Sequence, residues 1–290
     1  MNLTRPQSTG NTTSLVAQGL VTCCVFLAVQ RAVVADDKQP PMRVLQTPAG
    51  TRCGIFGDKP AAPAPTLFVF ASSVDEMAKS PVYSEAGRHL AEHGWLYVTV
   101  DLPCHGHDHR ADEPAALSGW AHRVKTGQAL MEPFVKRCVD VLDFLIAEGF
   151  TDPKRVAACG TSRGGFCALH FAAAEPRVRA VACISPVTNL LALSEFAGVT
   201  ESQVQSISIP SIADKLAGRA VWLSIGNHDP RVSTDDCIAT ARRLVAAARE
   251  RQADARVVPV ELVVGPSDGH HAIDDAYALA ARFVLRQFPE

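Results

Sequence analysis

The fold of this 290-residue chain is limited most by its continuous runs of apolar residues. Stretches with helical spacing separate these runs from one another. A strand that is apolar at every position is buried on both faces, which is typical of a parallel sheet covered by helices. Two short strands are predicted before these runs, at Met42 to Gln46 and Thr51 to Gly57. The apolar runs are Thr66 to Phe70, Trp95 to Val100, Arg155 to Cys159, Val178 to Ile184, Ala220 to Ile225 and Val257 to Val264. The pattern predicts a three-layer α/β fold with a mostly parallel central sheet of about eight strands.

Helical spacing between the strands predicts the flanking layers. A long helix is expected from about Thr126 to Gly149, and a helix of small residues from Gly164 to Ala174. Residues 36–290 are therefore predicted to form a single domain. Residues 189–218 depart from the strand–helix alternation, and we interpret them as a small cap inserted into that domain.

The first 35 residues resemble an export signal. A polar stretch precedes the apolar run Leu15 to Val29, and the small residues Val33 and Ala35 fit a signal-peptidase site with cleavage after Ala35. The run is too short to cross ~30 Å of hydrocarbon comfortably. We therefore expect an exported protein, periplasmic or secreted, with no stable membrane span in the mature chain. The alternative is a cytoplasmic protein in which this run is an extra strand or helix.

Charge and cysteine usage exclude several classes of protein. The chain has 28 basic and 30 acidic side chains, a net charge of −2, which argues against a nucleic-acid-binding protein. Nine cysteines without a C-x-x-C pair exclude a small disulfide scaffold and the common zinc patterns. The loop from His105 to His109 invites a metal interpretation, but alternating residues in a glycine-containing loop rarely converge on one ion. We expect no metal and no cofactor.

The sequence Gly160-Thr161-Ser162-Arg163-Gly164 is a G-x-S-x-G motif between a predicted strand and a predicted helix. A serine on such a tight turn exposes its Oγ above the carboxyl edge of the sheet, and flanking glycines allow neighbouring backbone to approach. The turn also directs the N–H of Arg163 and the helix N-terminus at the position of a developing oxyanion. The motif predicts Ser162 as a nucleophile, and the alternative is an ordinary tight turn.

A serine nucleophile needs a histidine base and an orienting carboxylate, expected here in the order Ser, acid, His. Asp229 follows the strand Ala220 to Ile225, although an Asp-Pro pair also begins ordinary turns. Two histidines follow the last strand, and we prefer His270 to His271 as the base. Asp235 and Asp236 are interpreted as residues of a helix start.

These motifs, with Asp101-Leu102-Pro103-Cys104-His105-Gly106, resemble the α/β-hydrolase superfamily, nearest to its prolyl-oligopeptidase/dienelactone-hydrolase-like serine esterase branch. The resemblance extends from about Met42 to the C-terminus. It implies that Ser162 is the nucleophile, His270 the general base and acid, and Asp229 the group that fixes the imidazole tautomer. Dienelactone hydrolases have a cysteine in this turn, so the serine departs from that activity.

The oxyanion hole is expected to combine the N–H of Arg163 with one from the loop Ala71-Ser72-Ser73-Val74, where Ser72 or Ser73 is the candidate and Ser72 is preferred. The Arg163 guanidinium either extends toward an acidic or sugar-bearing substrate or pairs with a nearby carboxylate. Trp120 and Phe196 either line the pocket or pack in the core or cap.

The residues therefore predict a serine hydrolase that cleaves carboxylic esters through an acyl-enzyme, acting on a small-molecule ester or acylated substrate. A serine peptidase or amidase with the same mechanism is the first alternative. A non-catalytic binding protein with this fold is the second, against which the Ser, Asp and His set argues.

Overall fold

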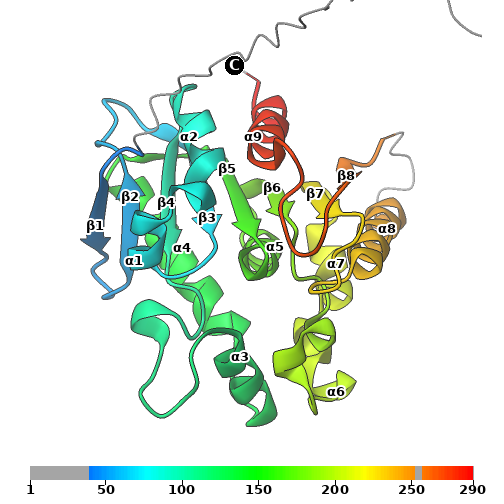
Figure 1. The fold of residues 1–290 in the computed structure, drawn as a ribbon. Helices are drawn as coiled ribbons and strands as arrows, with labels where there is room; N and C mark the ends of the chain where they lie inside the picture. Colours follow the sequence, from blue (N-terminus) through cyan, green and yellow to red (C-terminus); the bar gives the residue numbers. More distant parts are fainter. Residues whose placement is uncertain (1–38, 252–256, 290) are drawn as a thin grey trace, which may run out of the picture. The chain divides into compact units, whose positions relative to one another are not determined.

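The computed structural model describes residues 39–251 and 257–289, so the predicted leader at residues 1–35 lies outside the described residues. The described chain forms an eight-stranded sheet with the order β1-β2-β4-β3-β5-β6-β7-β8 (Figure 1). Strand β2 runs antiparallel to β1 and β4, and the other neighbours are parallel. The prediction of a mostly parallel sheet is confirmed. The strands are β1 (Met42–Gln46), β2 (Arg52–Phe56), β3 (Ala64–Phe70), β4 (Leu96–Val100), β5 (Thr151–Thr161), β6 (Val178–Ile184), β7 (Ala220–Gly226) and β8 (Val260–Gly265).

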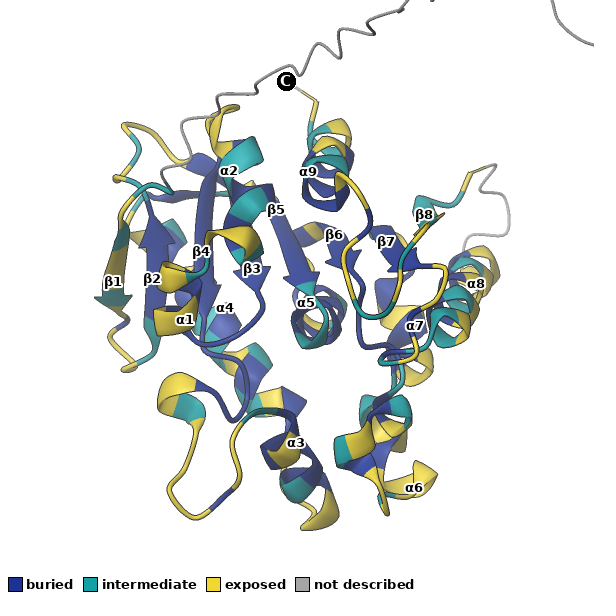
Figure 2. Ribbon diagram, viewed as in Figure 1, coloured by how far each residue is buried: buried dark blue, intermediate teal, exposed yellow. Residues whose placement is uncertain are grey.

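Helices cover both faces of the sheet and bury two separate apolar clusters. Helices α2 (Glu85–Ala91) and α9 (Ala276–Gln287) contribute to one cluster, and α4 (Met131–Ala147), α5 (Arg163–Ala174) and α8 (Thr234–Arg251) to the other. Strand β3 contributes side chains to both clusters, because Leu67 and Val69 belong to the first while Phe68 and Phe70 belong to the second. Figure 2 shows the central strands buried along their length, while the outer helices keep an exposed side.

The long helix predicted from about Thr126 to Gly149 forms as α4, but α4 begins at Met131 and not at Thr126. A separate helix, α3 (Ala116–Lys125), and a turn precede it. Gly127 adopts φ +69°, a left-handed conformation that follows the end of a helix. Pro133 has no N–H to donate, so it fits the first turn of α4 but not a helix interior.

The segment interpreted as a cap contains only short helices, of which α6 (Glu201–Val204) and α7 (Ile209–Leu216) are the α-helical ones. Helix α6 contacts α3, and both lie beyond the carboxyl ends of the parallel strands (Figure 1). Helix α7 instead packs between α5 and α8. Helix α3, from a different part of the chain, therefore accompanies the inserted segment at this end of the sheet. Two single-turn 3₁₀ helices precede α6 in the insertion, η3 (Leu190–Ala192) and η4 (Ser194–Phe196).

Candidate active site

Ser162 lies on the turn that joins β5 to α5. Its backbone adopts φ 55° and ψ −120°, a conformation that residues other than glycine rarely adopt. A Cβ on Gly160 would lie 2.1 Å from the carbonyl oxygen of Gly164, and a Cβ on Gly164 would lie 1.9 Å from that of Phe70. The two glycines thus allow α5 to begin in direct contact with its own strand and with the end of β3.

Three side chains from three strand ends meet at this turn. His270 Nε2 lies 2.9 Å from Ser162 Oγ, and His270 Nδ1 lies 2.8 Å from Asp229 Oδ2. Asp229 follows β7 and His270 follows β8, so the parallel sheet brings both to the edge where β5 ends. The His270 side chain is 29% exposed and that of Asp229 is fully buried, so solvent reaches the imidazole but not the carboxylate.

The Asp229 carboxylate is held by its own loop. Its Oδ1 accepts hydrogen bonds from the backbone N–H groups of Arg231 (3.0 Å) and Val232 (3.2 Å), which leaves Oδ2 for His270. The Thr234 hydroxyl donates to the carbonyl of Gly226 at 2.6 Å and accepts from the N–H of Asp229 at 3.1 Å. The carboxylate is therefore fixed before a substrate arrives. Sequence reasoning missed these supports, because backbone N–H groups have no signature in the side-chain pattern.

The rival residues lie elsewhere. The carbonyl of His271 accepts a hydrogen bond from the Ser185 hydroxyl at 2.9 Å, and its ring makes no bond to Ser162. Asp235 and Asp236 lie in the first turn of α8, as predicted. Burial raises the pKa of Cys159, the cysteine nearest the turn in sequence, to about 12, so this thiol stays neutral.

The predicted oxyanion loop follows β3. Arg163 is the first residue of α5, where a backbone N–H has no acceptor within the helix. Ser73 caps α1 (Val74–Lys79) by accepting from the N–H of Glu76, and the N–H of Val74 donates to Asp101 Oδ1 at 2.7 Å. The backbone N–H groups of Ser72 and Ser73 donate no hydrogen bond within the described chain, so both are available to an oxyanion.

The loop that holds His105 is built around a buried ion pair. Arg123 is 1% exposed, and its guanidinium donates to Glu113 and to Asp108. The hydrogen bonds from Arg123 lower the pKa of Glu113 to about 2, so the carboxylate stays ionised. Across residues 39–251 and 257–289, no group of three His, Cys, Asp or Glu side chains is placed to hold a metal ion.

Trp120 and Phe196, considered as pocket residues or packing residues, are both buried. The indole N–H of Trp120 donates to the Pro103 carbonyl at 2.6 Å, and its ring centroid lies 5.9 Å from that of Phe166. Both side chains serve as packing residues. The described chain contains no helix long and apolar enough to cross a membrane.

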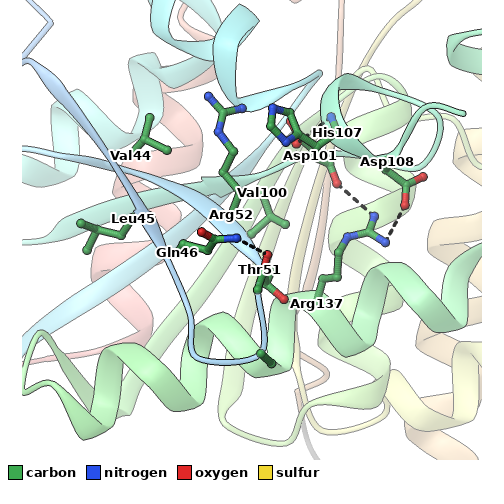
Figure 3. A pocket seen from close by; sticks show the side chains of 12 residues that line it. Val44, Leu45, Gln46, Thr51, Arg52, Val100, Asp101, His107, Asp108 and Arg137 are labelled. Atoms are coloured by element: carbon green, nitrogen blue, oxygen red, sulfur yellow. Dashed lines mark hydrogen bonds and ion pairs between the residues drawn. The ribbon is translucent and has the colours of Figure 1, made fainter.

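A cavity of about 610 Å³ opens beside β1 and β2 (Figure 3). Its charged side chains are already paired, since Arg137 contacts Asp108 at 2.6 Å and Arg52 contacts Asp75. Ser162 does not line it. This cavity is therefore separate from the site at the end of β5.

The strand order and the serine on the β5–α5 turn define an α/β-hydrolase fold. Residues 119–288 match the prolyl oligopeptidase family, and the chain belongs to that family. The family and the fold make the protein a serine hydrolase. No curated protein matches the chain.

Solved structures share the fold at low sequence identity. Acetyl xylan esterase 1 from Thermoanaerobacterium sp. is 15% identical with a TM-score of 0.58, and the match covers 88% of this chain and 90% of that one. A glucuronoyl esterase from Teredinibacter turnerae is 16% identical with a TM-score of 0.55, covering 86% and 73%. Porphyromonas gingivalis dipeptidyl peptidase 4 is 15% identical with a TM-score of 0.59, and the match covers 86% of this chain but 36% of the peptidase. The chain thus spans about a third of that peptidase.

Proposed function

We propose that this protein hydrolyses carboxylic esters with Ser162, His270 and Asp229 as a catalytic triad. The observation that carries the proposal is the continuous chain of hydrogen bonds from Ser162 Oγ to His270 Nε2, at 2.9 Å, and from His270 Nδ1 to Asp229 Oδ2, at 2.8 Å. Nucleophile and base within hydrogen-bond reach, with the base oriented by a third group, is the arrangement that activates a serine alcohol.

In the proposed reaction, Ser162 Oγ attacks the ester carbonyl while His270 Nε2 takes the hydroxyl proton. The carbonyl oxygen becomes an oxyanion, which accepts hydrogen bonds from the N–H of Arg163 and the N–H of Ser72. His270 then gives the proton to the leaving alcohol, and an acyl-enzyme remains. Water attacks the acyl-enzyme with His270 again as base, which releases the acid and restores Ser162. The Asp229 carboxylate stabilises the imidazolium that forms.

Ester rather than peptide cleavage is supported by how the related folds align. The acetyl xylan esterase is matched along 90% of its length, whereas most of the dipeptidyl peptidase lies outside the match. The family name points instead to a peptidase, which remains the second candidate.

The test compares ester substrates with amide substrates. Wild-type protein and Ser162→Ala are assayed on p-nitrophenyl acetate, an acetylated sugar, and aminoacyl p-nitroanilides. We expect wild type to hydrolyse the esters at least 100-fold faster, in kcat/KM, than the anilides, and Ser162→Ala to lose both activities, because the nucleophile is gone. Faster cleavage of anilides would replace the esterase proposal by the peptidase one.

We also propose that residues 1–35 direct export and are removed after Ala35. The support is the apolar run and the small residues of the sequence. Mass spectrometry of the protein from periplasmic or secreted fractions should find Asp36 at the N-terminus. An intact Met1 in those fractions would exclude cleavage, and recovery only from the cytoplasm would exclude export.

A further inference from the structure

A cation without a counterion lies next to the proposed nucleophile. Arg163 follows Ser162 directly, and its half-buried side chain makes no hydrogen bond or ion pair with any residue that the structure describes. Its Nε is buried and unpartnered. Burial lowers the pKa of this guanidinium, although arginine stays charged in proteins. Only Nε of the guanidinium is among the buried unpartnered atoms, so the Nη groups can still bind an anionic partner.

The carboxylate that acts on Arg163, that of Glu195, already pairs with Arg231. Glu195, in η4, lies close enough to Arg163 to favour its charged form, but Glu195 Oε1 is 2.5 Å from the guanidinium of Arg231. Arg231 itself opposes the charge on Arg163. Two cations therefore face one carboxylate, and the positive charge of Arg163 is left over. This answers the sequence-based alternative that Arg163 pairs with a neighbouring carboxylate.

A second unpartnered group lies nearby, on the loop after β4. His105 is 8% exposed, and its Nδ1 lies 2.8 Å from the Pro103 carbonyl oxygen. Because a carbonyl can only accept, Nδ1 carries the proton and Nε2 offers a lone pair. Burial lowers the pKa of His105 to about 4, and the positive charge of Arg163 contributes to that shift, so the imidazole is neutral near pH 7. Its Nε2 is buried and accepts no hydrogen bond from the described chain.

The His105 loop also touches the predicted oxyanion loop. A Cβ on Gly106 would lie 2.9 Å from Cβ of Ser73, so the two loops are in contact at this point. The loop that carries His105 thus contacts the loop of the predicted oxyanion donors, and the positive charge of Arg163, the residue after Ser162, acts on His105. A buried acceptor left without a partner is costly, so both groups are more stable with a ligand that satisfies them.

We propose that Arg163 and His105 form a subsite for a hydroxylated carboxylate. The guanidinium binds a free carboxylate of the substrate, and His105 Nε2 accepts a hydrogen bond from a substrate hydroxyl. This inference rests on the proposed esterase function and narrows it to esters of hydroxy acids, or of alcohols, that keep a free carboxylate near the scissile bond. Arginine suits this role because its planar fork matches a carboxylate with two hydrogen bonds.

The carboxylate part is tested with two matched pairs of esters. Mono-p-nitrophenyl adipate and p-nitrophenyl hexanoate have acyl chains of equal length, and only the first ends in a carboxylate. 4-Acetoxybenzoate and phenyl acetate differ by a carboxylate on the alcohol side. We expect the anionic member of at least one pair to have the higher kcat/KM, mainly through KM, because the contact is made in the ground state as well.

Arg163→Met should lower the anionic-to-neutral ratio of kcat/KM by about 10- to 100-fold, the range for a hydrogen bond to a charged group. Arg163→Lys should lower it less, because lysine keeps the charge but loses the fork. Arg242→Met is the control: this arginine is exposed on α8, so the variant has the same net charge and should keep the wild-type ratio.

The hydroxyl part is tested with malate and succinate as competitive inhibitors, because the two differ by one hydroxyl. We expect malate to bind about 3- to 10-fold more tightly, the range for a neutral hydrogen bond, and His105→Leu to make the two inhibition constants equal. His105→Gln, which retains an acceptor, should keep part of the difference.

The outcomes separate this inference from the proposed function. Three results would overturn the subsite while the esterase proposal stands. The first is hydrolysis of the neutral esters with no preference for either anionic ester, and the second is an anionic-to-neutral ratio of kcat/KM in Arg163→Met equal to that of wild type. The third is equal inhibition of wild type by malate and succinate. If wild type hydrolysed none of the four esters, the esterase proposal would fail and the subsite with it.

Discussion

Asp229→Asn tests whether the carboxylate sets the tautomer of His270. Oδ1 of residue 229 accepts from two backbone N–H groups, at 3.0 and 3.2 Å. An asparagine must keep its oxygen there, so its NH₂ group faces His270 Nδ1. The imidazole can then only accept at Nδ1, which puts its proton on Nε2. A protonated Nε2 cannot take the proton of Ser162.

The expected loss follows from this wrong tautomer. We expect kcat for a neutral p-nitrophenyl ester to fall about 10,000-fold, equal to about 5 kcal/mol of transition-state stabilisation, with KM little changed. Circular dichroism and thermal unfolding would verify that the variant is folded. Asp235→Asn is the control, because Asp235 is an exposed acid in the first turn of α8 and should keep full activity. A kcat of Asp229→Asn within tenfold of wild type, or an equal loss in the control, would refute the reasoning.

Three further predictions concern stability. Gly164→Ala places a Cβ 1.9 Å from the Phe70 carbonyl oxygen. It should lower the free energy of unfolding, measured with denaturant, by about 1–3 kcal/mol and remove most of the esterase activity. Normal stability would contradict the close packing of the turn. Arg123→Met leaves the buried carboxylate of Glu113 unpaired and should cost about 3–5 kcal/mol, whereas a neutral effect would show that the ion pair is dispensable. Burial lowers the pKa of His170 to about 4, below the ~6.5 of an unfolded histidine. The free energy of unfolding therefore holds the full contribution of neutral His170 above pH 6.5. It should fall by about 3 kcal/mol as the pH drops from 6.5 to 4, because the unfolded chain takes up the proton first. His170→Gln should flatten that part of a stability–pH curve, and an unchanged slope would contradict the assignment.

The strands were predictable because burial on both faces leaves only apolar residues. Strand β6 begins and ends at the predicted Val178 and Ile184. The edge strand β1 also has its predicted bounds, Met42 and Gln46, although none of its residues is buried. The helix predicted from about Thr126 begins instead at Met131, because apolar spacing does not report where the backbone can start a helix. Pro133 was the available signal, since a proline fits the first turn of a helix and not its interior.

The residues of the candidate site were identifiable for a topological reason. Ser162, Asp229 and His270 each follow a strand, and the ends of parallel strands share one edge of the sheet. The effect of the Arg163 charge on His105 was not predictable in this way, because the two residues belong to loops that no spacing in the sequence relates.

A fluorophosphonate probe, followed by mass spectrometry of the labelled peptide, shows whether Ser162 is an activated nucleophile. Wild type should gain a phosphonyl group on Ser162, and Ser162→Ala should gain none. Ser202→Ala, which removes an exposed serine of α6, should label like wild type. A wild-type protein that stays unlabelled, or a Ser162→Ala variant labelled as fully as wild type, would contradict the activation of Ser162.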